Sequence, residues 1–180
     1  MGEIKSTLDL VLEKTKHLTL SSEDKQAQAQ KEVENRIKGM LQKYQDGLLT
    51  RDDLITEYDS LEKDLSRKNH KLLIDEIFSR VDPNQNNQSL LELLPACCHI
   101  DPARVEAVIN DFRQNYNSAA QKRSKRLKEN LAQKYFISGS AVVPNLEEDE
   151  QWRRTEAEMR QRFEDQLSRE KDKLVVDCVD

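Results

Sequence analysis

Between Pro102 and Tyr135 the sequence continues without a glycine or a second proline, and its apolar residues recur every three or four positions. That spacing places them on one face of an α-helix. Asp101 and Pro102 form a start signal, because a capping acid followed by proline is a common helix beginning. The helix would be about 50 Å long at roughly 1.5 Å per residue. We therefore predict that its far end projects from the molecule or packs on another chain.

The composition agrees with long helices that each bury a narrow apolar stripe. Charged residues make up 35% and apolar residues 36% of the 180 residues, which leaves little material for a thick core. Four glycines and four prolines are too few for a turn-rich β protein. The predicted fold is all-α, with a helical hairpin region followed by long, charged, partly coiled-coil-like helices.

Changes in pattern along the chain suggest four segments. They are a helical region containing an antiparallel hairpin (1–94), a linker and the long helix (95–135), a linker whose valines favour extended backbone (136–145), and a charged, partly detached C-terminal helix with a short tail (146–180). Within the first segment we expect helices at about 3–17, 22–46 and 51–81. Asn145 is the expected cap of the last helix.

The turn of the predicted hairpin has strong local signals. Gly47 suits the left-handed end of one helix, and Thr50 with Asp53 forms a capping box for the next. This stretch resembles the helical hairpin of SHOCT-type modules of bacterial proteins over about residues 40–68, and the residues that match are Gly47, Leu48, Leu49, Thr50, Asp53 and Leu54. The resemblance implies oligomerisation or partner binding. The chain as a whole is similar to bacterial helical proteins without a known activity.

Cys97, Cys98 and His99 are the first place to look for chemistry. Zinc sites space their cysteines by about two to four residues, so adjacent cysteines bind one ion poorly. A cysteine and histidine this close in sequence rarely have the geometry of a nucleophile and its base. We interpret these residues as small buried groups near a helix end and predict no catalytic residue, no metal site and no cofactor. The alternative is a thiol or metal site at 97–99.

The loop that begins at Asp82 resembles the opening of a calcium-binding loop, because oxygen-bearing residues alternate at Asp82, Asn84 and Asn86. Leu93 stands where such a loop needs its bidentate glutamate. We therefore predict a polar turn between helices.

Basic residues cluster in the long helix, with no acidic residue between Phe112 and Glu129. This segment, 113–128, could contact nucleic-acid phosphates, an acidic partner helix, or the acidic run 147–150 of the same chain. Trp152 could anchor an interface or belong to a local core with Val142 and Val143. The predicted partner-binding residues are Arg113, Lys122, Arg123, Lys125, Arg126, Leu127, Leu131, Tyr135, Trp152, Met159 and Phe163.

These observations favour a non-catalytic helical scaffold that binds a copy of itself or another helical chain, with nucleic-acid binding as the alternative. A net charge of −5 gives no general attraction to nucleic acid. No apolar run approaches the roughly 20 residues that a membrane span needs. Three cysteines, two of them adjacent, argue against a disulfide framework. We expect a cytoplasmic homo-oligomer.

Overall fold

The computed structural model describes residues 22–65 and 70–177, and the regular structure in these ranges is entirely helical. The predicted all-α fold is therefore confirmed. The helices are α2 (Ser22–Gln45), α3 (Arg51–Leu65), α4 (His70–Ser79), α5 (Gln88–Leu91), α6 (Leu93–Cys98), α7 (Ala103–Tyr135) and α8 (Glu150–Asp177). The helix expected at 3–17 and the end of the tail, including Cys178, lie outside the described residues.

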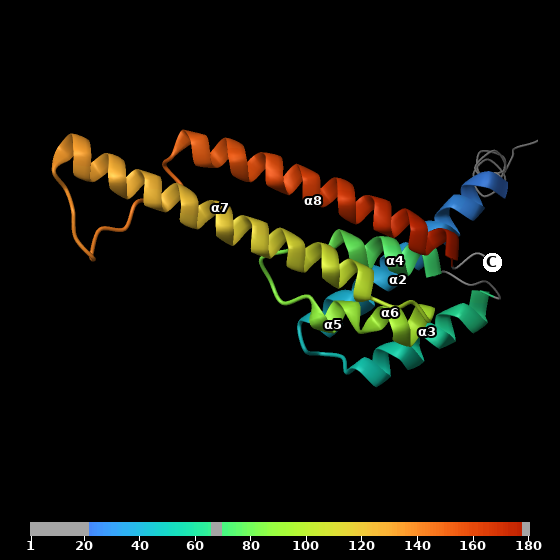
Figure 1. The fold of residues 1–180 in the computed structure, drawn as a ribbon. Coiled ribbons are helices and arrows are strands. Elements are labelled where there is room, and N and C mark those ends of the chain that lie inside the picture. The colour runs from blue at the N-terminus through green and yellow to red at the C-terminus, as the bar shows by residue number, and fades with distance from the viewer. Residues whose placement is uncertain (1–21, 66–69, 178–180) are drawn as a thin grey trace, which may run out of the picture.

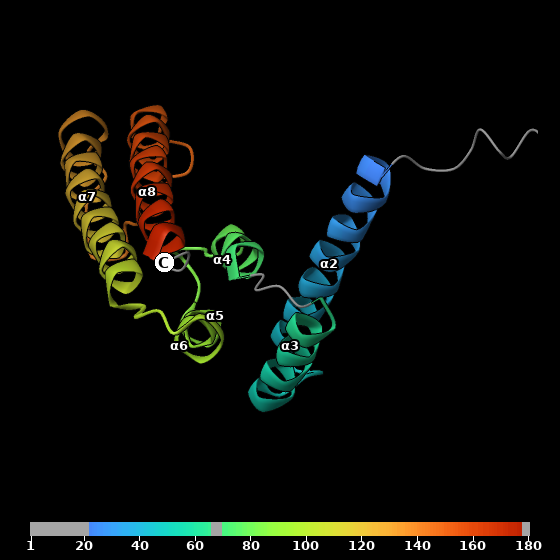
Figure 2. The same cartoon turned by 90° about the vertical axis from the view of Figure 1, so that its right-hand side faces the viewer.

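The helices form three layers, which lie side by side in Figure 2. The α2–α3 hairpin makes one outer layer and the α7–α8 pair makes the other. Helices α4, α5 and α6 lie between them, where α4 contacts α2, α6 and α8, and α6 contacts α3. The two long pairs are therefore joined through short, more apolar helices.

The turn between α2 and α3 forms as predicted. Gly47 adopts a left-handed conformation with φ of 71°. The backbone N–H of Asp53 donates to Thr50 Oγ1 at 3.2 Å, and the Thr50 hydroxyl donates to Asp53 Oδ2 at 2.6 Å. Helix α3 therefore begins six residues after α2 ends, and the two helices run antiparallel and bury Ile37, Leu41 and Leu54.

The single helix predicted for 51–81 is wrong, because the described residues form two helices, α3 and α4, with 66–69 outside the description. Figure 1 shows that they do not share an axis. The run 66–71 contains no apolar side chain, so it interrupts the stripe that would keep one helix against its neighbours. The break lets α4 turn its own apolar face, including Ile74 and Ile77, toward α2, α6 and α8.

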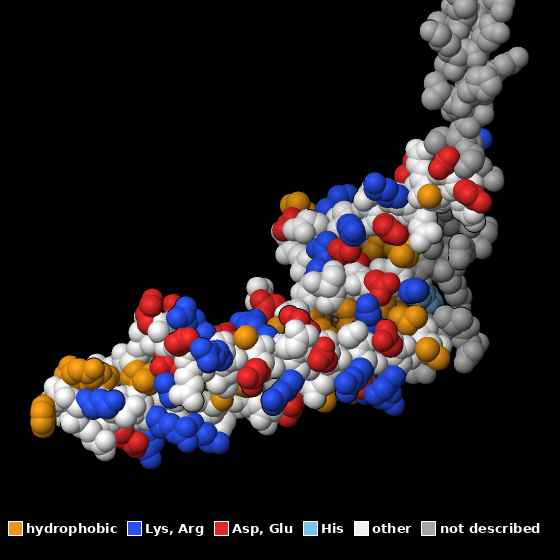
Figure 3. Space-filling view, turned by 90° about the horizontal axis from the view of Figure 1, so that it is seen from above, with side chains coloured by type: hydrophobic (Ala, Val, Ile, Leu, Met, Phe, Trp, Pro, Cys, Tyr) orange, Lys and Arg blue, Asp and Glu red, His pale blue; other side chains and the backbone are white. Residues whose placement is uncertain are grey.

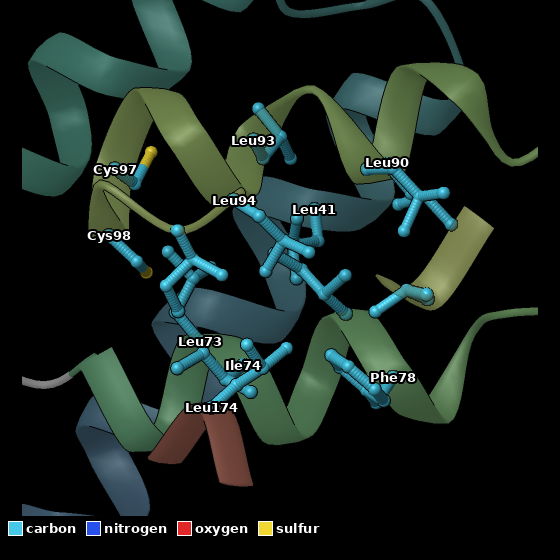
Figure 4. Packing of buried hydrophobic residues seen from close by; sticks show 14 of the residues in the cluster. Leu41, Leu73, Ile74, Phe78, Leu90, Leu93, Leu94, Cys97, Cys98 and Leu174 are labelled. Atoms are coloured by element: carbon cyan, nitrogen blue, oxygen red, sulfur yellow. The ribbon is translucent and has the colours of Figure 1, made fainter. Parts of the chain in front are cut away.

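The main core lies around α6. Leu93 and Leu94 are fully buried there, and side chains from α2, α4, α5 and α8 converge on them (Figure 4). Those labelled in the figure are Leu41, Leu73, Ile74, Phe78, Leu90 and Leu174. Because residues far apart in sequence share this cluster, the core depends on all three layers.

The sequence predicts a partly detached C-terminal helix, and this prediction is wrong. Helix α8 packs along α7 and on α4, and its Leu174 is 5% exposed within the core. Lys171 Nζ lies 3.1 Å from Asp75 Oδ1 of α4. Apolar contact with α4 therefore fixes the end of α8. The few apolar residues of α8 did not predict this contact from the sequence alone.

The segment 80–87 is the polar turn that the sequence predicts. Its side-chain oxygens accept hydrogen bonds from N–H groups two residues later: Asp82 Oδ1 from Asn84 N at 2.9 Å, and Asn86 Oδ1 from N of Gln88, the first residue of α5, at 3.0 Å. Arg113 of α7 donates through Nε to the Pro83 carbonyl at 2.7 Å and also donates to the Gln85 carbonyl. The turn thus attaches α7 to the middle layer.

None of the helices in 22–65 and 70–177 combines the length and apolar character needed to cross a lipid bilayer.

Replacing Leu94 with alanine should lower the free energy of unfolding by about 2–5 kcal/mol, since the truncation leaves a cavity where the leucine was fully buried. Urea denaturation followed by circular dichroism measures this change. The matched control is Leu48→Ala, because Leu48 is 77% exposed and should change stability by less than about 0.5 kcal/mol. Equal effects at the two positions would contradict the core described here.

Candidate functional site

Helices α7 and α8, with the connecting loop 136–149, form an arm that extends well beyond the other helices (Figure 1). Aromatic side chains join the two helices along the arm. The rings of Phe112 and Phe163 are 5.1 Å apart, and those of Tyr116 and Trp152 meet edge to face at 5.3 Å. Such contacts add to the apolar burial that holds the two antiparallel helices together.

The side chains of Trp152 and Phe163 are therefore buried between α7 and α8 of the same chain. Trp152 is 3% exposed and packs on Tyr116, whereas Val143, its expected neighbour, is 83% exposed. Of the two interpretations of Trp152, the local core residue is the one that describes its environment. The other expected neighbour, Val142, is half-buried.

An ion pair closes the outer end of this seam. Arg123 donates through Nε and Nη2 to the two carboxylate oxygens of Asp149, at 2.8 and 2.7 Å. These hydrogen bonds hold the pKa of the Asp149 carboxyl below its usual range and raise the pKa of Arg123. Pairing between the basic segment and the acidic run of the same chain is thus confirmed at one position.

Asp149 also begins α8. Its Oδ1 accepts a hydrogen bond from the backbone N–H of Trp152 at 2.7 Å, the contact expected of a helix cap. The predicted cap, Asn145, instead accepts from Glu147 N in the preceding turn, at 3.0 Å. The cap lies four residues later than predicted because Arg123 fixes the Asp149 carboxylate at that place.

The outer end of the arm exposes four large apolar side chains, Tyr135, Phe136, Ile137 and Val143, which we call the tip. Figure 3 shows hydrophobic side chains gathered at the end of the arm. Phe136, 90% exposed, ends α7 with φ of 58°, a left-handed conformation that favours glycine. For a residue with a Cβ this conformation costs about 1–2 kcal/mol.

The basic residues predicted to bind a partner divide into two groups. Arg113 and Arg123 are held within the chain by the contacts above. Lys122, Lys125 and Arg126 are exposed, as is Lys128 of the same basic segment, and in the described ranges none of the four has an ion-pair partner. The apolar members Leu127, Leu131 and Met159 are half-buried on the arm.

Cys97 and Cys98 end α6 as buried side chains, as predicted. Their sulfur atoms point in different directions (Figure 4). Burial raises the pKa of the Cys97 thiol to about 11, helped by the charges of Asp59 and Glu62. Within the described part of the chain, no three His, Cys, Asp or Glu side chains gather in a way that could hold a metal ion.

Sequence reasoning missed a partly buried polar cluster beside these cysteines. Tyr58 donates from its hydroxyl to Glu62 Oε1 at 2.9 Å, and His70 Nε2 lies 3.4 Å from the same oxygen. Burial and the contact with Glu62 raise the pKa of Tyr58. The spacing of Tyr58 and Glu62 on one helix was a visible signal, but His70 lies on α4 and joins them through the tertiary fold.

No protein-family model matches the chain, and neither a curated protein nor a solved structure matches it.

Two substitutions of Asp149 should destabilise the arm to different extents. Asp149→Asn keeps an acceptor for the Trp152 N–H but loses the charge, so we expect a loss of about 1 kcal/mol. Asp149→Ala loses the cap as well, and the loss should reach about 2 kcal/mol. Thermal and urea unfolding measure both, and identical stability of the two variants would contradict the dual role.

The contribution of the Asp149 charge should also depend on pH. Folding lowers the pKa of this carboxyl, so the stabilisation is present above the ordinary aspartate pKa of about 3.9 and is lost as the pH falls through the lowered value. The stability difference between the wild type and Asp149→Asn should therefore be constant near neutral pH and shrink in acid. If this stability difference instead grew as the pH fell, the lowered pKa of Asp149 in the folded state would be contradicted.

The thiols at the end of α6 should react slowly. With a pKa near 11, about one Cys97 in a thousand is a thiolate at pH 8, and burial restricts access further. In a Cys178→Ser background, a chromogenic disulfide reagent should modify Cys97 and Cys98 at least tenfold faster in denaturant than in buffer. Rapid modification of the folded protein would favour the reactive-thiol alternative.

Proposed function

We propose that this protein is a non-catalytic helical scaffold of the bacterial cytoplasm that acts through its α7–α8 arm by binding another helical chain, either a copy of itself or a different protein. The proposal rests on one observation. The end of the arm exposes the tip residues, and Phe136 is 90% exposed in a left-handed backbone conformation.

Two unfavourable features coincide at Phe136. Water surrounds a large apolar side chain, and the backbone takes a conformation that glycine would adopt without strain. The side chain is 90% exposed, so its burial does not stabilise the fold. The left-handed backbone closes α7, where the Ile137 N–H donates to the Leu131 carbonyl at 3.2 Å, and glycine would make the same closure without strain. Strained positions of this kind are found where function demands them, so contact with a partner is the explanation we adopt.

The arm is suited to present such a surface. The aromatic seam and the Arg123–Asp149 ion pair hold α7 and α8 together up to the start of α8, and α7 continues for about three further turns to Tyr135. Because regular helix carries Tyr135 at the tip, this part of the backbone loses little conformational freedom when it binds, which favours affinity. Apolar side chains in such a position are suited to fill a pocket or groove of a partner.

Nucleic-acid binding is the competing proposal, and the unpaired charges of Lys122, Lys125, Arg126 and Lys128 favour it. Fewer basic side chains are available for phosphate contacts than the sequence suggests, because Arg113 and Arg123 bind other groups of the same chain. Phosphate contacts also give no role to Ile137 and Val143. A protein partner accounts for both the apolar tip and the charges next to it.

Replacing Phe136 with glycine separates function from stability. Removal of the left-handed strain should leave the free energy of unfolding unchanged or raise it by about 1 kcal/mol. The same change removes an apolar side chain that is 90% exposed, so an affinity-tagged Phe136→Gly chain expressed in its source cells should lose the proteins that the wild type retains through the tip. Quantitative mass spectrometry after mild crosslinking measures this loss.

The matched control is Leu48→Ser, which removes an exposed apolar residue from the α2–α3 turn. This variant should retain the same proteins as the wild type. If wild type, Phe136→Gly and Leu48→Ser recover the same proteins in equal amounts, the tip is not a binding surface. Recovery of nucleic acid in place of protein, sensitive to salt, would favour the competing proposal.

A further inference from the structure

A second surface of the arm is a groove of about 520 Å³ between α7 and α8. Phe112 and Phe163 form its buried floor, with Ala119 and Met159 half-buried beside them. Its rims are polar and exposed. The groove lies on the opposite side of α7 from Arg113, which faces the 80–87 turn, so the middle layer does not cover it.

The spacing of the lining residues is that of a helix-binding groove. On α7 the lining includes Asn115, Ser118 and Lys122, and on α8 it includes Thr155 and Arg162, in each case at steps of three, four or seven. Residues at these steps form ridges and grooves into which another helix can pack. Ser118, Ala119 and Thr155 are small, so a helix backbone can approach closely.

The charges along the α7 rim decide which helix fits. Asp111 and Lys122 carry opposite charges at the two ends of the lining stretch, about 16 Å apart along the helix. Both are exposed, and in 22–65 and 70–177 neither has an ion-pair partner. A second α7 laid antiparallel over the first would bring each Asp111 opposite the Lys122 of the other copy.

Two-fold symmetry requires this kind of self-complementarity, because in such an interface residue i meets j and residue j meets i. The α8 rim offers the same property on a smaller scale, since Glu158 and Arg162 lie one turn apart with opposite charges. Their existing contact is a weak one, 3.9 Å between highly exposed groups, and can be exchanged.

We propose that the groove between α7 and α8 is a homodimer interface in which a second copy packs antiparallel, with Asp111 of each chain against Lys122 of the other. The inference rests on the proposed function and names a second copy as the helical chain that the arm binds. An antiparallel dimer places the two tips at opposite ends, so both remain free for another partner.

The test is the solution mass of the full chain, measured by light scattering at several concentrations. The wild type should form dimers. Asp111→Lys and Lys122→Asp should each raise the dimer dissociation constant about tenfold or more, because each replaces two attractive contacts with two repulsive ones. An equimolar mixture of these two variants should recover dimers, since lysine at 111 of one chain then meets aspartate at 122 of the other while the remaining pair is native.

Lys31→Asp is the control, because Lys31 is an exposed lysine of α2 outside the groove and its reversal should leave dimerisation unchanged. A monomeric wild type at every concentration would overturn the inference, and so would dimers that the two groove variants form as well as the wild type. Failure of the mixture to recover dimers would exclude the antiparallel pairing. Each of these results leaves the tip experiment with Phe136→Gly as a separate measure of the proposed function.

Discussion

Burial of the short apolar helices α4 and α6 is the interaction on which the rest of this structure depends. Leu93, Leu94 and Ile74 are fully buried there, whereas each long helix is charged over most of its surface. Two charged hairpins have too little apolar area to form a thick core with each other. The middle layer supplies that area, and both outer layers are positioned by their contact with it.

Charge is distributed so that the arm is held together and still leaves cations unpaired. Helix α8 satisfies several of its own acids through pairs at four-residue spacing, such as Glu150–Arg154 and Glu156–Arg160. Such exposed pairs contribute little individually. The Arg123–Asp149 pair differs, because it is bidentate, largely shielded from water and joined to a helix cap. It therefore fixes where α8 begins, and hence which part of α7 extends past it.

The surfaces that we connect with function lie on the part of the arm that contributes least to the core. Stability concentrates around α6, so the end of α7 and the loop after it are free to hold strain and exposed apolar groups. The tip and the groove occupy different parts of this arm. One chain can therefore associate with a copy of itself and leave its tip available for another protein.

The sequence by itself determined what is local: the all-α class, the capped turn at Gly47 and Thr50, the end of the long helix at Tyr135, and the burial of Cys97 and Cys98. Helical periodicity and caps act between residues a few positions apart, so they can be read directly. The tertiary structure decided which faces meet. It divided 51–81 into α3 and α4, capped α8 at Asp149, placed Trp152 on Tyr116, and brought His70 to Glu62. An apolar stripe or a charged run fits many partners equally well, and the choice among them depends on how all the layers pack together.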